Sequence, residues 1–186
     1  MAPRTKGGKS RDGFAAPAGL RLWAPWRYSY LRRAVAGPKR CIFCLGRLTE
    51  AERKHRLVLF DTGAAVVMLN LYPYNIGHLM IAPRRHVASP ELLTGEERAV
   101  VGDLVAASVK SLRRIMRPQA FNVGANLGRA AGAGFADHMH WHIVPRWEGD
   151  TNFVPVLAST RVVSQSLDET WARLRPVFKA LATELS

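Results

Sequence analysis

Short apolar runs along the chain predict a set of strands joined by turns. The sequence Asp61-Thr62-Gly63 between two of these runs is typical of a hairpin turn. Pro145 should end the last strand, because proline lacks the backbone N–H that a central strand donates. The predicted strands cover residues 56–60, 64–69, 77–82, 121–126 and 138–144.

Two longer segments carry apolar residues at helical spacing. Thr94 and Glu97 form a capping-box sequence, which predicts the start of a long helix with one apolar face. Ser166 and Glu169 predict the start of a C-terminal helix, in which Pro176 should cause a kink or a break.

The order of these elements predicts the fold class. Strands come first, then one long helix, then more strands, which favours an α+β domain with an antiparallel sheet and its helices on one side. A parallel doubly wound sheet is disfavoured because helices and strands do not alternate. The 186 residues suit one domain with an appendage, and we place the boundary between a disordered basic tail at 1–19 and a domain at 20–186.

Positive charge is concentrated at the start of the chain. The net charge is +13, and residues 1–40 hold ten Lys and Arg with Asp12 as their one acid. Such a tail could bind nucleic acid or an anionic surface. For the first twenty residues we favour a solvated extension and expect no nucleic-acid partner, since basic and aromatic residues are not interleaved in that stretch. An organellar transit peptide stays open as a third reading.

Composition also excludes two classes of protein. The longest stretch without Asp, Glu, Lys or Arg, Thr62–Pro83, is interrupted by asparagine, proline, glycine and histidine, so no membrane span is predicted. Two cysteines are too few for a secreted disulfide scaffold, and we expect a cytoplasmic location.

Three histidines at alternate positions form the most informative motif. His138, His140 and His142 make up half of the six histidines in the chain. In a strand all three would point to one face, with Met139 and Trp141 on the other. Chelation of a metal by all three imidazoles is one explanation of this pattern.

This motif resembles the histidine triad (HIT) family, whose hallmark of three histidines separated by apolar residues is matched by 138–144. Asn70–Val87 looks like the nucleotide-binding hairpin of this family, and Phe121–Gly128 looks like its phosphate-side strand and loop. Three further segments, Leu22–Arg27, Cys41–Cys44 and Pro145–Phe153, look like the bacterial branch of diadenosine tetraphosphate phosphorylases and hydrolases. The resemblance covers about residues 20–185.

The resemblance implies a mechanism. His140 would attack the α-phosphate of a nucleotide and form a nucleotidyl-imidazole intermediate. His142 would hydrogen-bond the phosphate and assist departure of the polyphosphate. His78 is expected to orient a neighbour rather than to react. His138 completes the predicted catalytic set.

The resemblance also implies substrate contacts. Phosphoryl oxygens would be held by Asn126 and by backbone N–H groups around Gly134 and Phe135. Asn70 would contact the ribose, and Leu69 and Leu71 would shape the base pocket. Simpler roles stay open: Asn126 could cap a turn, Asn70 could satisfy hairpin backbone groups, and Trp147 could contact either the substrate or a neighbouring subunit.

Cys41 and Cys44 have the two-residue gap that lets two thiolates bind one ion. Alone the pair could equally be two reduced thiols or a redox pair. The resemblance adds His86 and His138 and implies a structural zinc held by two cysteines and two histidines. As a zinc ligand, His138 could position His140 but could not donate a proton.

The predicted function is therefore cleavage of dinucleoside polyphosphates through a nucleotidyl-histidine intermediate. Phosphate as the acceptor would make the protein a phosphorylase, and water would make it a hydrolase. Alternatives are a nucleoside phosphoramidase and a non-catalytic nucleotide- or RNA-binding module. The family resemblance implies a homo-oligomer, at least a dimer.

Overall fold

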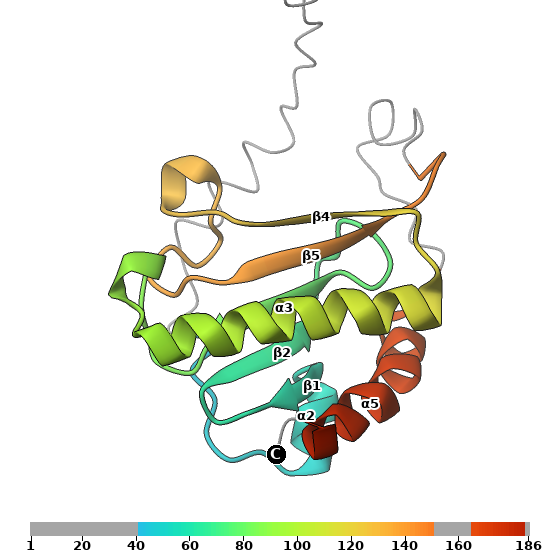
Figure 1. Ribbon diagram of the computed structural model, residues 1–186, viewed down its shortest axis with the longest axis horizontal. Coiled ribbons are helices and arrows are strands. Elements are labelled where there is room, and N and C mark those ends of the chain that lie inside the picture. The colour runs from blue at the N-terminus through green and yellow to red at the C-terminus, as the bar shows by residue number, and fades with distance from the viewer. Residues whose placement is uncertain (1–40, 151–164, 185–186) are drawn as a thin grey trace, which may run out of the picture.

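A computed structural model describes residues 41–150 and 165–184 (Figure 1). The predicted basic tail at 1–19 and the aromatic stretch at 20–31 lie outside these residues, so the proposed boundary stays a prediction. The described part contains β1 (Val58–Asp61), β2 (Ala65–Leu69), β3 (Leu79–Pro83), β4 (Ala120–Ala125) and β5 (Trp141–Arg146), together with α2 (Glu50–His55), α3 (Gly95–Met116), α5 (Leu167–Glu184) and two short 3-10 turns, Pro90–Leu92 and Arg129–Ala131.

The five strands form one antiparallel sheet in the order β1-β2-β3-β5-β4. This arrangement confirms the predicted α+β class with an antiparallel sheet. β5 lies between β3 and β4, so the strand that carries His142 is an inner strand, while β4 forms an edge among the described residues.

The β1–β2 hairpin forms at the predicted turn. Thr62 N–H donates to Ala65 O at 3.0 Å, and Gly63 N–H donates to the Asp61 carboxylate at 3.0 Å. Gly63 has a φ of +84°, which glycine adopts without the clash that a Cβ atom would cause. The sequence of the turn therefore sets the register of the first two strands.

Helix α3 begins at the predicted capping box. The Thr94 hydroxyl accepts the Glu97 N–H at 3.1 Å, and the Glu97 carboxylate accepts the Thr94 N–H at 2.8 Å. The helix ends at Met116, and its C-cap, Arg117, has a left-handed φ of +50° directly before Pro118. At the same end Gly77 lies so close to Met116 that a Cβ atom there would be 2.6 Å from its sulfur.

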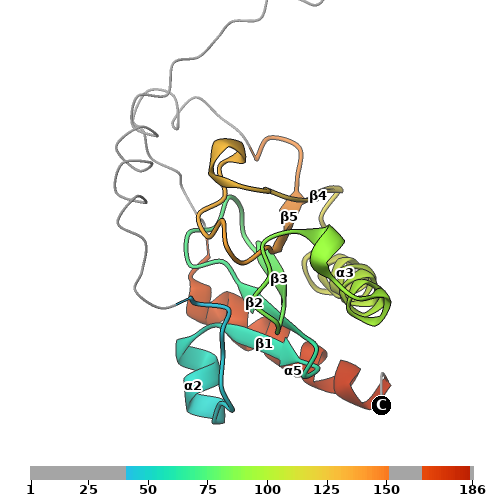
Figure 2. The ribbon, with the colours of Figure 1, turned by 90° about the vertical axis from the view of Figure 1, so that its left-hand side faces the viewer.

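The two faces of the sheet pack differently. One face joins β1, β2, β3 and β5 to α3 and α5 in the main core, which includes Leu69, Ile143, Leu104 and Phe178. The other face carries a smaller cluster around Phe43. Figure 2 shows α3 and α2 on opposite sides of the sheet. Helices α3 and α5 thus leave one face of the sheet to the segment that begins at Cys41.

Two element predictions differ from the structure. β5 begins at Trp141, so His138 and His140 precede the strand, and it runs through Pro145 to Arg146 instead of stopping. Beyond Ile143 the strand pairs with β4 alone, which is where a sheet tolerates proline. Helix α5 spans Leu167–Glu184 with Pro176 inside it, so Pro176 does not end the helix, and the kink stays a prediction. No helix among the described residues is long and apolar enough to cross a membrane.

Candidate active site and metal-binding group

The three histidines lie on the face of the sheet opposite α3. The side chains of this segment alternate between the two faces although β5 begins only at Trp141. Met139 lies on the side away from the histidines, where it packs with Val87 and Leu93 beside Trp141. The His140 and His142 rings are 4.8 Å apart between centroids. The segment 138–142 therefore gathers the imidazoles at one place, as the alternating sequence predicts.

His140 is held in one tautomer. Its Nδ1 lies 3.0 Å from the His138 carbonyl oxygen, and because a carbonyl can only accept, Nδ1 must carry the proton. The lone pair is therefore on Nε2. The ring is 4% exposed and packs against Phe43, with centroids 4.6 Å apart. A neutral imidazole with a fixed lone pair on Nε2 is a competent nucleophile.

His142 is held through His78. The Tyr74 N–H donates to His78 Nδ1 at 3.0 Å, and the Asn70 amide nitrogen lies 3.4 Å from the same atom. Neutral His78 therefore carries its proton on Nε2, which donates to His142 Nδ1 at 2.9 Å. In neutral His142 the proton is consequently on Nε2, so this atom is a hydrogen-bond donor. This geometry places His78 against His142, in agreement with the expectation that His78 orients a neighbour.

Burial favours the neutral form of all three triad histidines. Desolvation lowers the pKa of His138 and His140 below the ordinary histidine value. Desolvation and, second, the neighbouring His140 lower the pKa of His142 to about 4. Near neutral pH the site therefore presents a neutral imidazole with a lone pair on Nε2 beside a neutral imidazole with an N–H on Nε2.

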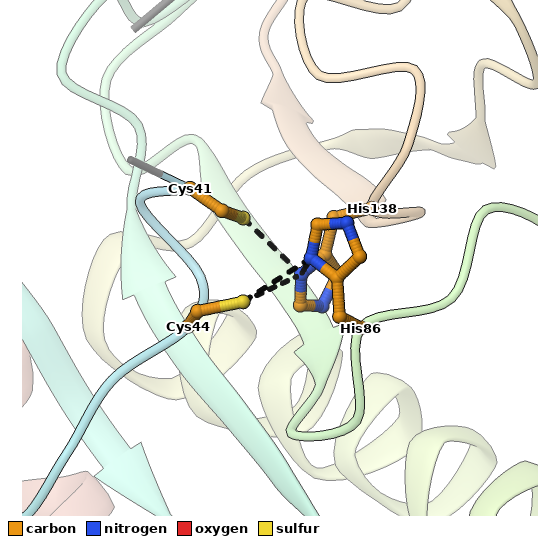
Figure 3. A group of neighbouring side chains, drawn as sticks. All are labelled: Cys41, Cys44, His86 and His138. Atoms are coloured by element: carbon orange, nitrogen blue, oxygen red, sulfur yellow. Dashed lines mark hydrogen bonds between the residues drawn. The ribbon is translucent and has the colours of Figure 1, made fainter. Parts of the chain in front are cut away.

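The four predicted metal ligands lie together. Cys41, Cys44, His86 and His138 each place one donor atom within 4.8 Å of the others (Figure 3). The Cys41 and Cys44 sulfurs are 3.2 and 3.6 Å from His138 Nδ1. His86 Nδ1 lies 3.2 Å from both Cys44 Sγ and His138 Nδ1. The prediction that these four residues meet is confirmed.

The donor chemistry fits a tetrahedral zinc ion. Zinc bonds of about 2.0–2.3 Å place ligand atoms about 3.3–3.8 Å apart in a tetrahedron, close to the separations found here. His138 Nε2 lies 2.8 Å from the Pro83 carbonyl oxygen and must donate to it. Its Nδ1 lone pair is therefore directed toward the sulfurs, as in histidines that bind a metal.

The other predicted site residues are distributed around the triad. The Asn70 side chain also accepts the Tyr72 N–H at 2.9 Å, so it does satisfy a hairpin backbone group. Leu71 is 58% exposed, whereas Leu69 is 1% exposed and packs in the core beneath α3, away from the histidines. We therefore no longer place Leu69 in the base pocket, because strand alternation turns it toward the helices.

The remaining residues lie in the loops that flank β4 and β5. Asn126 directly follows β4, and Gly134 is exposed in the loop that leads to the histidines. The Phe135 ring packs edge-on against Phe43 at 5.6 Å, and Trp147 directly follows β5. Their contacts with a substrate stay predictions.

Sequence reasoning missed two features of this region. Phe43, between the cysteines, contacts both His138 and His140. Asn75 and Asp150 join the β2–β3 loop to the end of β5 through a 2.8 Å hydrogen bond. An aromatic residue inside a Cys-x-x-Cys segment was a usable signal for the first. Nothing in the local sequence pairs two residues that are 75 positions apart.

Comparison with known proteins agrees with the geometry. An AP-4-A phosphorylase from Mycobacterium tuberculosis is 38% identical over an alignment of 168 positions that covers 82% of this chain and 85% of that protein. An adenosine 5′-monophosphoramidase from Schizosaccharomyces pombe is 31% identical over 106 residues, 57% of this chain and 74% of that protein.

A solved structure shares the fold. The zinc-bound histidine triad family protein from Mycobacterium smegmatis superposes with a TM-score of 0.55 and 18% identity, over 84% of this chain and 96% of that chain. The HIT domain itself matches residues 51–149, more than half of this sequence. The chain belongs to the histidine triad family.

Proposed function

We propose that this protein cleaves dinucleoside polyphosphates such as diadenosine tetraphosphate through a nucleotidyl-His140 intermediate. The observation that carries the proposal is the fixed tautomer of His140, whose Nδ1–H donates to His138 O and leaves the Nε2 lone pair for attack. The similarity to the Mycobacterium tuberculosis AP-4-A phosphorylase over most of both chains supports the same substrate class.

In the first step the lone pair of His140 Nε2 forms a bond to the α-phosphorus. The bond from that phosphorus to the bridging oxygen breaks, and the polyphosphate leaves with the electron pair. The Nε2–H of His142 donates to the phosphate and stabilises the negative charge that develops there. For diadenosine tetraphosphate the products of this step are adenylyl-His140 and ATP.

In the second step an acceptor attacks the same phosphorus and releases His140. Water yields AMP, and inorganic phosphate yields ADP. We propose that Asn126 and the backbone N–H groups near Gly134 and Phe135 hold the phosphoryl oxygens, since these residues flank the histidine segment. Asn70 would contact the ribose, and the exposed Leu71 would contact the base. Trp147 would contact the substrate beyond the end of β5.

Replacement of the nucleophile tests this mechanism. His140→Ala should lower turnover of diadenosine tetraphosphate by about 10³-fold or more, because the covalent route is lost, while nucleotide affinity changes little. The adenylyl-protein should appear by mass spectrometry in the wild type and be absent from the variant. His55→Ala, which replaces an exposed histidine of α2, is the matched control. Rapid turnover by His140→Ala would exclude His140 as the nucleophile.

The acceptor is identified by product analysis. With diadenosine tetraphosphate, a phosphorylase forms ADP and ATP only when inorganic phosphate is present. A hydrolase forms AMP and ATP without it. Separation of the nucleotides by chromatography, with and without phosphate, distinguishes the two activities.

A nucleoside phosphoramidase is the second candidate. The Schizosaccharomyces pombe relative with 31% identity carries that activity in its name, and a P–N bond would be cleaved by the same attack of His140. A kcat/KM for adenosine 5′-phosphoramidate well above that for diadenosine tetraphosphate would favour this candidate.

We propose that zinc binds Cys41, Cys44, His86 and His138 in a structural role. The ion would hold the Cys41–Cys44 segment in place, so that Phe43 packs against His140. It would also fix the His138 carbonyl, which accepts the hydrogen bond from His140 Nδ1. We also propose a cytoplasmic location, where thiolate ligands stay reduced, and a homo-oligomer with β4 at its interface.

A further inference from the structure

The Asp150 carboxylate joins two segments that flank the triad. It accepts hydrogen bonds from Arg146 Nε and Nη2, both at 2.7 Å, and from the Trp147 N–H at 3.0 Å. It also accepts one from Asn75 Nδ2 at 2.8 Å. The carboxylate is 9% exposed, so these bonds are largely shielded from water. Asp150 therefore ties the β2–β3 loop to the end of β5.

The Asn75 side chain holds the loop at a second point. Its Nδ2 also donates to the Pro145 carbonyl at 3.1 Å. The two acceptors fix the orientation of the amide, because only its NH₂ end can face a carbonyl and a carboxylate. Pro145 lies three residues after His142 on the same strand. The loop is therefore fastened to the strand that carries His142.

Asn75 is adjacent to the groups that determine the proton of His142. Its backbone carbonyl accepts the His78 N–H at 3.2 Å, and the preceding residue, Tyr74, donates its N–H to His78 Nδ1 at 3.0 Å. The Tyr74 ring also stacks on His142, with centroids 5.8 Å apart and planes 23° apart. A shift of Asn75 would therefore move the Tyr74 amide.

We propose that Asn75 and Asp150 are positioning residues: their hydrogen bond holds the Tyr74 N–H on His78 Nδ1 and so keeps the proton of His142 on Nε2, facing the substrate phosphate. The proposal deepens the proposed function and rests on it for the role of His142 in turnover. Its structural part, the control of a tautomer, does not depend on the reaction.

The consequence of losing this contact is a reversal of polarity at His142. Without the Tyr74 N–H, His78 Nδ1 keeps only the longer contact to the Asn70 amide nitrogen at 3.4 Å. A His78 tautomer with its proton on Nδ1 then becomes accessible, and in it Nε2 is an acceptor. His142 must then donate from its own Nδ1, which leaves a lone pair on Nε2. A lone pair facing a phosphoryl oxygen repels it, where the N–H would have stabilised it. One displaced amide would therefore convert a donor into an acceptor two rings away.

Asn75→Asp is the decisive variant. It keeps the size of the side chain and an oxygen for the Ile76 N–H, but it removes both donated hydrogen bonds and places two carboxylates together. We expect kcat with diadenosine tetraphosphate to fall by about 10- to 100-fold, less than the 10²–10³-fold loss typical of a direct donor. KM should change by less than kcat.

Nitrogen NMR measures which ring nitrogen of each histidine carries the proton. A purely structural role of Asn75 and Asp150 would leave these tautomers unchanged. In ¹⁵N-labelled wild type, long-range proton–nitrogen spectra should show His78 and His142 protonated on Nε2. In Asn75→Asp we expect a second population of both rings protonated on Nδ1. Asp150→Asn, which weakens the same contact without adding a charge, should move both rings in the same direction and serves if the first variant does not fold.

Asn122→Ala is the matched control. In the wild type the Asn122 carboxamide oxygen accepts a hydrogen bond from Arg146 Nη1 at 2.9 Å. The variant therefore perturbs the guanidinium that also binds Asp150, but it leaves the β2–β3 loop unchanged. Its tautomers and kcat should equal those of the wild type. Unchanged tautomers in folded Asn75→Asp or Asp150→Asn, or an equal change in Asn122→Ala, would overturn the inference. A wild type that shows the tautomers but no turnover would contradict the proposed function alone.

Discussion

The three histidines lie in three different hydrogen-bond arrangements, although His138 and His142 both carry the proton on Nε2. His138 donates from Nε2 to Pro83 O and presents Nδ1 to the cysteines. His140 donates from Nδ1 to His138 O and keeps its Nε2 lone pair. His142 accepts at Nδ1 from His78 and keeps its proton on Nε2. The partner of each ring, and not the ring itself, determines which nitrogen carries the proton and which keeps a lone pair.

The lowered pKa of His142 predicts how stability depends on pH. The unfolded chain takes up a proton near the ordinary value of 6.5, but the folded chain resists protonation until about pH 4. Between these values the unfolded state binds more protons, so the free energy of unfolding should decrease as pH falls from about 6.5 toward 4. Above this window His142 is neutral in both states and contributes no slope.

Urea denaturation at several pH values measures this slope. His142→Gln keeps an N–H donor but cannot titrate, so its free energy of unfolding should decrease less between about pH 6.5 and 4.5 than that of the wild type. Both proteins are compared with zinc in excess, because protonation of metal ligands adds its own pH dependence. Equal slopes for the two proteins would show that His142 is not held neutral by the fold.

The elements around the site were predictable to different degrees. The hairpin turn at 61–63 and the capping box of α3 formed where their sequences indicate, because each depends on contacts only two or three residues apart. The beginning of β5 did not, since the segment before Trp141 is bound elsewhere: Met139 N–H donates to Val87 O at 2.7 Å. Pro145 stayed inside the strand because only β4 pairs with that end.

The site shows the same division. The alternating sequence predicted that the three imidazoles share one face. The family resemblance predicted that Cys41, Cys44, His86 and His138 lie together, as they do in the structure. The Asn75–Asp150 contact and the packing of Phe43 on His140 depend on how separate elements meet in space. No local period or spacing encodes such contacts.

The group formed by Cys41, Cys44, His86 and His138 predicts that removal of a metal lowers the thermal stability of the protein. Zinc at about 100 times its dissociation constant would stabilise the folded state by about 2.7 kcal/mol. Its removal should therefore lower Tm by about 5–10 °C for a chain of this size. Thermal melting with and without a zinc chelator measures the change, and elemental analysis should give one zinc per chain.

Variants separate this site from other zinc binding. Cys44→Ser should lose both the zinc and the sensitivity to chelator, because it removes one ligand of the group. His55→Gln, in exposed α2, is the control and should keep both. A wild type without zinc, or a Cys44→Ser variant that retains it, would contradict the assignment of these four ligands.

The described sheet has two edge strands, β1 and β4. The residues of β1 are mostly buried and those of β4 mostly exposed, so the β4 edge predicts how copies of the chain assemble. Within residues 41–150 and 165–184, β4 pairs with β5 on one side and with no strand on the other. An open edge strand is a template for pairing with another chain. Val123 on this strand is 48% exposed and Leu127 just beyond it is 44% exposed, so apolar surface accompanies the unpaired backbone. We therefore expect two copies to pair through β4.

A charge on this edge should separate the copies. Val123→Lys places an ammonium group where β4 would meet its partner, and lysine is a residue that natural edge strands use against pairing. Sedimentation velocity should show a dimer or larger assembly for the wild type and a monomer for this variant. Leu92→Lys, a matched change of a 55% exposed leucine away from β4, should leave the assembly intact. A monomeric wild type would contradict the predicted assembly. An assembly that persists in Val123→Lys would show that its interface does not include this part of β4.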